Sequence, residues 1–188
     1  LLNSVHITEL AEGGSDLVSI TGGGAITLDS SFANVEAYSL AETSTVTIEL
    51  DALSNPGGYS ITGSANTLVN TGDDTFIIDG GVGLATNSPQ LFSGVNIDGN
   101  SNSAAGDTIE VAGGGIVDLA AVGVTVTGIE NVVLDAASNL TLNDTSYKVT
   151  GSAGVDTITG GLGNDTIDGG AGIDSISSGG GSDTVTLD

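Results

Sequence analysis

The sequence predicts an all-β protein, a parallel β-solenoid or β-roll built from tandem modules and ending in nonapeptide repeats. Three observations predict this fold. Residues from 151 onward repeat every nine positions, segments of the first half return in the second half, and short β-branched runs alternate with Gly, Asn, Asp and Ser. Such spacing is typical of stacked solenoid coils rather than of hairpins. A β-sandwich is the alternative for residues 1–60.

The nonapeptide units have two positions that never change in character. The sixth residue of each unit is an aspartate, and the eighth is a β-branched apolar residue. The aspartates are Asp156, Asp165, Asp174 and Asp183, and the apolar residues are Ile158, Ile167, Ile176 and Val185. Glycines permit the tight turn between strands. A flexible Gly/Ser-rich linker has no reason to keep these positions in phase.

Two nonapeptides per coil place equivalent residues eighteen positions apart, on rungs separated by about 4.7–4.9 Å. The neighbours expected from this spacing are Ile158 with Ile176, Ile167 with Val185, Asp156 with Asp174, and Asp165 with Asp183. Carboxylates that close repel one another, and the segment contains no Lys or Arg. The pattern therefore indicates a hard cation held by oxygen ligands.

The units match the signature Gly-Gly-x-Gly-x-Asp-x-apolar-x, and residues 151–186 resemble the RTX (repeats-in-toxin) calcium-binding β-roll family. They are similar to the repeat regions of bacterial surface-layer proteins and large secreted adhesins. Family members bind Ca²⁺ between successive turns, through the motif aspartates and the carbonyl groups of the glycine turns. The resemblance therefore implies that the four motif aspartates are calcium ligands. The turn glycines that it implies are Gly151, Gly154, Gly160, Gly161, Gly163, Gly169, Gly170, Gly172, Gly179 and Gly181.

Two serines depart from the signature. Ser152 replaces the second glycine of the first unit, and Ser178 replaces the first glycine of the last. We expect these departures to weaken individual sites. We also expect the segment to become ordered only when the ion binds, because unpaired carboxylates and glycine-rich backbone both oppose folding.

Outside the strict repeats, three aspartates are weaker metal candidates. Asp74, in Gly72-Asp-Asp-Thr-Phe-Ile-Ile, occupies the motif position of a degenerate unit, and Asp107 follows another degenerate turn. Asp168 is the ninth residue of the second strict unit. The alternative for such residues is that Asp and Asn simply favour β-turns.

Composition limits the partners of this chain. Among 188 residues there are 24 acidic side chains and one base, Lys148, which leaves a net charge of −23. Nucleic acids and anionic membranes are bound through Lys and Arg, so neither is an expected partner. The chain is nevertheless 38% hydrophobic and can bury a core. No cysteine is present, and no apolar run is long enough to insert into a membrane.

Catalysis has few candidate residues, and we predict that the chain is not an enzyme. His6 is the only histidine, and there is no arginine. Neither a nucleophile-elbow sequence nor a dinucleotide-binding glycine motif is present. We therefore predict no catalytic residues and no organic cofactor, and Ca²⁺ as the only cofactor.

Internal similarity predicts tandem modules. Asp16–Gly24 parallels Asp107–Gly115, Phe32–Leu40 parallels Val126–Leu134, and Tyr59–Asn66 parallels Tyr147–Gly154. We expect a first solenoid module with degenerate repeats at 1–97, a second at 98–182 that ends in the nonapeptides, and the start of a third at 183–188. Residues 82–105 are expected to form an excursion from the solenoid. Val35 and Glu36 should be equivalent to Ile129 and Glu130.

These features together predict a calcium-binding structural module of a secreted or cell-surface bacterial protein. The module should fold and self-associate on calcium binding, as in a surface layer, an extracellular filament or an adhesin. Its expected partners are calcium ions and further copies or modules of the same protein. The alternative is a non-catalytic RTX domain of a type I-secreted enzyme, such as a protease, lipase or epimerase. A less favoured alternative is an ice- or polysaccharide-binding face formed by Thr157, Thr166 and Thr184.

Overall fold

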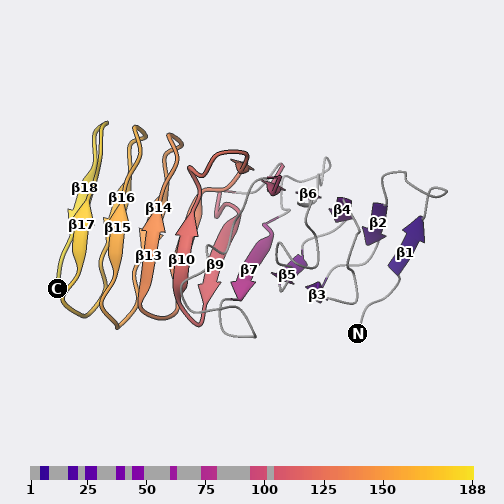
Figure 1. The fold of residues 1–188 in the computed structure, drawn as a ribbon, viewed down its shortest axis with the longest axis horizontal. Helices are drawn as coiled ribbons and strands as arrows, with labels where there is room; N and C mark the ends of the chain where they lie inside the picture. Colours follow the sequence, from indigo (N-terminus) through magenta and orange to yellow (C-terminus); the bar gives the residue numbers. More distant parts are fainter. Residues whose placement is uncertain are drawn as a thin grey trace.

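The computed structural model describes residues 5–8, 17–20, 24–28, 37–40, 44–48, 60–62, 73–79, 94–100 and 104–188. These residues form eighteen β-strands and no helix, which confirms the all-β solenoid. The strands are stacked as rungs along one long axis, with β1 at one end and β17 and β18 at the other (Figure 1). Within the described ranges, no helical segment has the length and apolar character of a membrane span.

Three sheets make up the walls of the solenoid. The eight-stranded sheet contains β3 (Gly24–Leu28), β5 (Ser44–Ile48), β7 (Thr75–Asp79), β9 (Thr108–Ala112), β12 (Asn131–Leu134), β14 (Lys148–Thr150), β16 (Thr166–Asp168) and β18 (Thr184–Thr186). The six-stranded sheet contains β1 (Val5–Thr8), β2 (Leu17–Ile20), β4 (Ala37–Leu40), β6 (Ser60–Thr62), β8 (Asn96–Asp98) and β11 (Thr125–Thr127). The four-stranded sheet contains β10 (Gly115–Asp118), β13 (Ser138–Thr141), β15 (Thr157–Thr159) and β17 (Ser175–Ser177).

The chain alternates between walls as it advances. From β2 to β9 it passes between the six- and eight-stranded sheets, and from β12 to β18 between the eight- and four-stranded sheets. β10 and β11 follow one another in a single coil, so the second wall changes from one sheet to the other there. Every strand pair is parallel except β1 with β2, among the described strands.

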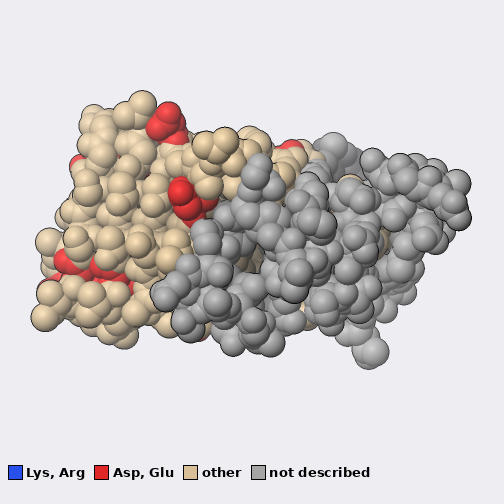
Figure 2. Space-filling view, in the orientation of Figure 1, with Lys and Arg blue, Asp and Glu red and all other residues tan. Residues whose placement is uncertain are grey.

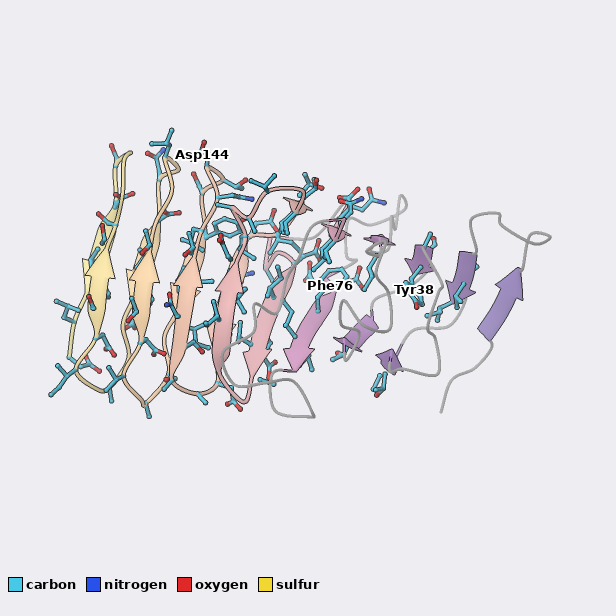
Figure 3. All side chains as sticks on the ribbon, viewed as in Figure 1. Tyr38, Phe76 and Asp144 are labelled. Carbon is cyan, nitrogen blue, oxygen red and sulfur yellow. The ribbon has the colours of Figure 1, made fainter. Side chains whose placement is uncertain are left out.

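The core is a set of apolar columns that run along the solenoid axis. In the eight-stranded sheet the central column consists of Phe76, Ile109, Val132, Val149, Ile167 and Val185. In the four-stranded sheet it consists of Val117, Leu140, Ile158 and Ile176. Tyr38 of β4 is buried as well, like Phe76 of the central column (Figure 3). Each fully buried side chain of this kind contributes about 1.5–3 kcal/mol through loss of exposed apolar area.

The predicted eighteen-residue register of the nonapeptides is confirmed. Ile158 pairs with Ile176 between β15 and β17, and Ile167 pairs with Val185 between β16 and β18. Ile158 and Ile167 are fully buried, whereas Val185 is 41% exposed, because β18 has a paired neighbour on one side only.

The expected excursion at 82–105 is wrong for the residues that form β8. Asn96–Asp98 pairs in parallel with both β6 and β11 and is therefore a rung of the stack. Ile97 of β8 and Val95, which precedes the strand, are buried in the core, and this alternation is the ordinary pattern of a strand with one face inward. Val35 and Glu36 lie outside the described residues, and the module boundaries stay a prediction.

Candidate calcium centre

The four motif aspartates lie where a glycine turn enters a strand. Asp156 and Asp174 precede β15 and β17 of the four-stranded sheet, and Asp165 and Asp183 precede β16 and β18 of the eight-stranded sheet. Strand register places each pair on neighbouring rungs, as the spacing predicts. The aspartates therefore form two columns, one for each wall.

Each motif aspartate binds the backbone of the preceding coil. Its Oδ1 accepts a hydrogen bond from the N–H eighteen residues earlier. The donor and acceptor pairs are Ser138 to Asp156 (2.7 Å), Tyr147 to Asp165 (2.9 Å), Asp156 to Asp174 (2.9 Å) and Asp165 to Asp183 (3.0 Å). A carboxylate in this position satisfies an N–H group at the entrance to a strand, and it needs only one of its two oxygens to do so.

Two of the weaker candidates, Asp74 and Asp107, belong to the column of Asp165 and Asp183 in the eight-stranded sheet. The N–H of Asp74 donates to Oδ1 of Asp107 (2.6 Å), and the N–H of Asp107 donates to Oε2 of Glu130 (2.9 Å). Asp74 and Asp107 are both buried. The strands that follow Asp74, Asp107 and Glu130 are β7, β9 and β12, which precede β14, β16 and β18 in the eight-stranded sheet. Glu130 was not a sequence candidate. Its place directly before a strand was the available signal.

Asp168 has a different position. It ends β16, at the opposite end of the strand from Asp165, and its side chain is exposed. Its Oδ1 accepts a hydrogen bond from the N–H of Gly170, two residues later (3.1 Å). This contact is the local turn interaction that aspartate favours.

Among the four motif aspartates, Asp165 has a buried carboxylate oxygen without a hydrogen-bond partner. Its side chain is 1% exposed, and its Oδ2 has no hydrogen-bond partner. Burial raises the pKa of this carboxyl above its ordinary value, the charge of Asp183 raises it further, and the hydrogen bond from Tyr147 lowers it only in part. A buried carboxylate with an unpaired oxygen destabilises the fold unless a positive partner reaches it.

Asp156 contrasts with Asp165, because both of its oxygens are engaged. Besides the bond from Ser138, its Oδ2 accepts bonds from the N–H of Ser152 (2.8 Å) and from the Oγ of Ser152 (2.9 Å). Asp156 is fully buried.

The turns bring backbone carbonyl groups of neighbouring coils against the glycines. A Cβ atom at Gly160 would collide with the carbonyl oxygen of Ser178, and one at Gly170 with that of Ser152. The same close approach to a carbonyl oxygen of a neighbouring coil occurs at Gly151, Gly161, Gly163, Gly172, Gly179 and Gly181. Gly154 instead faces Ala137, and Gly169 faces Asp174 and Ile176. The turns are therefore dense in carbonyl oxygens as well as carboxylates.

The donor set fits a hard divalent cation. Within the described residues, no three Asp, Glu, His or Cys side chains gather into a cluster, so the carboxylates alone do not make a cation site, and the backbone carbonyl oxygens of the turns are the further protein ligands at hand. Carboxylates together with backbone carbonyls are the ligands that Ca²⁺ prefers. In Figure 2 acidic side chains reach the surface over the described coils. Residues 149–188 contain no Lys or Arg to neutralise them.

Comparison with known families agrees with this geometry. The family model of the RTX calcium-binding nonapeptide repeat matches residues 150–185, in four copies. The chain shows no significant match to a curated protein or to a solved structure. Repeats of this family form a structural calcium-binding β-roll that is not itself catalytic. The C-terminal part of this solenoid, residues 150–185, is therefore made of RTX nonapeptide repeats, which bind calcium ions.

Proposed function

We propose that this chain is the calcium-dependent structural part of a secreted or cell-surface bacterial protein. In this proposal calcium binds at the turns that precede β16 and β18 and completes the fold of the C-terminal coils. The observation that carries the proposal is the buried, unpartnered Oδ2 of Asp165. A group of this kind needs a positive partner, and residues 149–188 supply no basic side chain.

Asp165, Asp183 and the carbonyl groups of the neighbouring glycine turns would hold the ion. When bound, calcium supplies positive charge that offsets the desolvation of the carboxylates. The chain itself holds the two carboxylates in position. Tyr147 fixes Oδ1 of Asp165 by its N–H, and Asp165 fixes Oδ1 of Asp183 in the same way. The second oxygen of each aspartate is left for the cation.

A calcium titration of the chelator-treated chain tests this proposal. We expect binding with a dissociation constant on the order of 10⁻⁴–10⁻³ M, the range of extracellular modules. Circular dichroism should report a gain of β-structure over the same calcium range, because binding free energy becomes folding free energy. Absence of binding at millimolar calcium, measured by isothermal titration, would contradict the proposal.

Asp165→Asn is the variant that should remove this response. Asp135→Asn is its matched control, since it makes the same change of charge at an exposed position after β12. The control should bind calcium as the unmodified chain does. Equal calcium binding by both variants would show that Asp165 is not a calcium ligand.

The location follows from the calcium requirement. Calcium is scarce inside cells and abundant outside them, so an acidic chain that folds by binding it would stay loose before export and fold afterwards. Typical secretion of RTX proteins by type I systems supports this location.

Self-association is the further part of the proposal. Chains that carry a net charge of −23 repel one another until cations screen them. Light scattering of the parent protein should therefore show ordered assemblies in calcium and dispersal in chelator. Folded protein that stays monomeric in calcium would favour the accessory domain of a secreted enzyme instead.

A further inference from the structure

The first nonapeptide contains a feature that the second lacks. Ser152 fills the second position of the first unit, where the second unit has Gly161. The Oγ of Ser152 donates to Oδ2 of Asp156 (2.9 Å) and accepts a bond from the N–H of Gly154 (3.0 Å). The hydroxyl group therefore links the beginning, the middle and the end of its turn.

The Asp156 carboxylate is satisfied entirely by protein groups. It accepts the N–H of Ser138 at Oδ1, and the N–H and Oγ of Ser152 at Oδ2. Hydrogen bonds to an ionised acceptor are about twice as strong as those between neutral groups. A cation approaching Oδ2 would meet two donors whose positive ends already point at that oxygen. The donor set around Asp156 therefore does not fit a bound ion.

The corresponding position of the second unit cannot take a side chain. A Cβ atom at Gly161 would collide with the carbonyl oxygen of Asn143, one coil earlier. Asp165 consequently has no hydroxyl donor, and its Oδ2 is unpaired. Two units with the same aspartate thus differ in whether the protein itself satisfies the carboxylate.

From this difference we infer that Ser152 replaces calcium at the first repeat. The inference rests on the proposed function, in which calcium serves Asp165. The turn at 151–156 folds without metal and forms the base on which the calcium-dependent coils stack. Ile158, which follows this turn, is fully buried in β15, so the first coil is also held by apolar contacts. Any ion bound near Asp174, the neighbour of Asp156 on the next coil, would accordingly lack the Asp156 side chain as a ligand.

Hydrogen exchange of the Ser138 amide tests the metal-free turn, because that N–H donates to Asp156. In chelator, we expect this amide to be protected in the unmodified chain, and added calcium should leave its protection unchanged. Ser152→Ala keeps the Cβ atom and removes only the hydroxyl. Protection of Ser138 should then fall by roughly ten- to a hundredfold, the range for hydrogen bonds to charged groups.

Ser152→Gly restores the full repeat signature and gives the complementary result. Its Asp156 loses the hydroxyl donor and becomes available to a cation. Isothermal titration should therefore show one more calcium ion than the unmodified chain binds, and Ser138 protection should become calcium-dependent. If either serine variant unfolds in chelator, recovery on addition of calcium supports the replacement, and failure to recover contradicts it.

Two results would overturn the inference. One is a Ser138 amide that is protected in the unmodified chain only when calcium is present. The other is a pair of serine variants with unchanged protection in chelator and unchanged calcium stoichiometry. A failure of the proposed function gives a different result. The unmodified chain would then bind no calcium, whereas the protection of the Ser138 amide in chelator would still fall in Ser152→Ala.

Discussion

The backbone N–H of Asp165 donates a hydrogen bond to Oδ1 of Asp183, one coil further along the chain (3.0 Å). Asp165 accepts the same kind of bond from Tyr147, one coil earlier. At Asp165, Oδ1 therefore binds the backbone of the preceding coil, and Oδ2 takes no part in that contact. That second oxygen is buried and unpaired. The backbone N–H at this turn is therefore satisfied, whereas the carboxylate charge of Asp165 is not.

Asp165→Asn should stabilise the metal-free chain and abolish its calcium response. The amide oxygen can still accept the N–H of Tyr147, and the buried charge is removed. We expect a higher free energy of unfolding in chelator, by roughly 1 kcal/mol, because burial of a neutral amide costs less than burial of an unpaired carboxylate. Chemical denaturation in chelator measures the difference.

Asp156→Asn is the matched comparison, and it should change the free energy of unfolding in the opposite direction. Its amide NH₂ group would face the two donors of Ser152, so we expect a loss of stability in chelator. Equal effects of the two asparagine variants would show that the two aspartates do not differ as described.

Gly161→Ala should destabilise the C-terminal coils. Its Cβ atom would collide with the carbonyl oxygen of Asn143, a backbone atom that cannot move away alone. Gly180→Ala is the control, because its Cβ atom would meet the flexible end of the Leu162 side chain at 3.1 Å and no carbonyl group. Thermal unfolding in calcium should show a clear decrease for the first variant and little change for the second. A comparable loss from both would argue against close carbonyl packing at Gly161.

The periodic part of the molecule was predictable because local spacing determines it. Two nonapeptides per coil fix the register, and so the neighbours of Ile158 and Asp165 follow from counting. Spacing could not identify Glu130 as a member of the acidic column, because the loops before β12 differ in length from the nonapeptide turns. The β8 rung was missed for a similar reason: Ile97 of β8 and Val95 before it are both buried, but they belong to a stretch of sequence without the nine-residue period.

Ser152 shows a different limit of sequence reasoning. As a departure from the glycine signature it predicts only a weaker site. Its actual partners depend on the rotamer of a small side chain and on whether the neighbouring coil leaves space for a Cβ atom. Gly161 lacks that space, and no pattern in the sequence reports the difference.

Stability should fall at alkaline pH because of Tyr147. Burial raises the pKa of its phenol above the ordinary value of about 10, with further contributions from the charges of Asp165 and Glu130, while hydrogen bonds with Thr145 and Asn143 lower it in part. A raised acid pKa means that the folded state holds its proton longer than the unfolded state does. The stabilising difference is therefore complete below pH 10 or so and is lost as pH rises through the folded-state pKa.

Tyr147→Phe isolates this contribution from the other two tyrosines. The variant removes the hydroxyl bond to Asn143 (3.1 Å) and leaves the ring packed. The free energy of unfolding of this variant should change less between about pH 9 and pH 11 than that of the unmodified chain, because a phenol titrates in roughly that range. Parallel pH profiles for the two proteins would assign the alkaline effect to other groups.

Two neighbouring residues of one apolar column, one enclosed and one at its end, should respond very differently to truncation. Ile167 is fully buried in β16, whereas its neighbour Val185 in β18 is 41% exposed. Ile167→Ala should cost about 2–5 kcal/mol through lost burial and a cavity between β14 and β18. Val185→Ala removes fewer buried atoms and leaves no enclosed cavity, so its effect should stay well below that range. Hydrogen exchange of the Val149 amide, measured in calcium, reports the loss within the column, since coils of a solenoid couple mainly to their neighbours. Equal exchange rates in the two variants would mean that the C-terminal coils open as one unit, independently of the column that fills them.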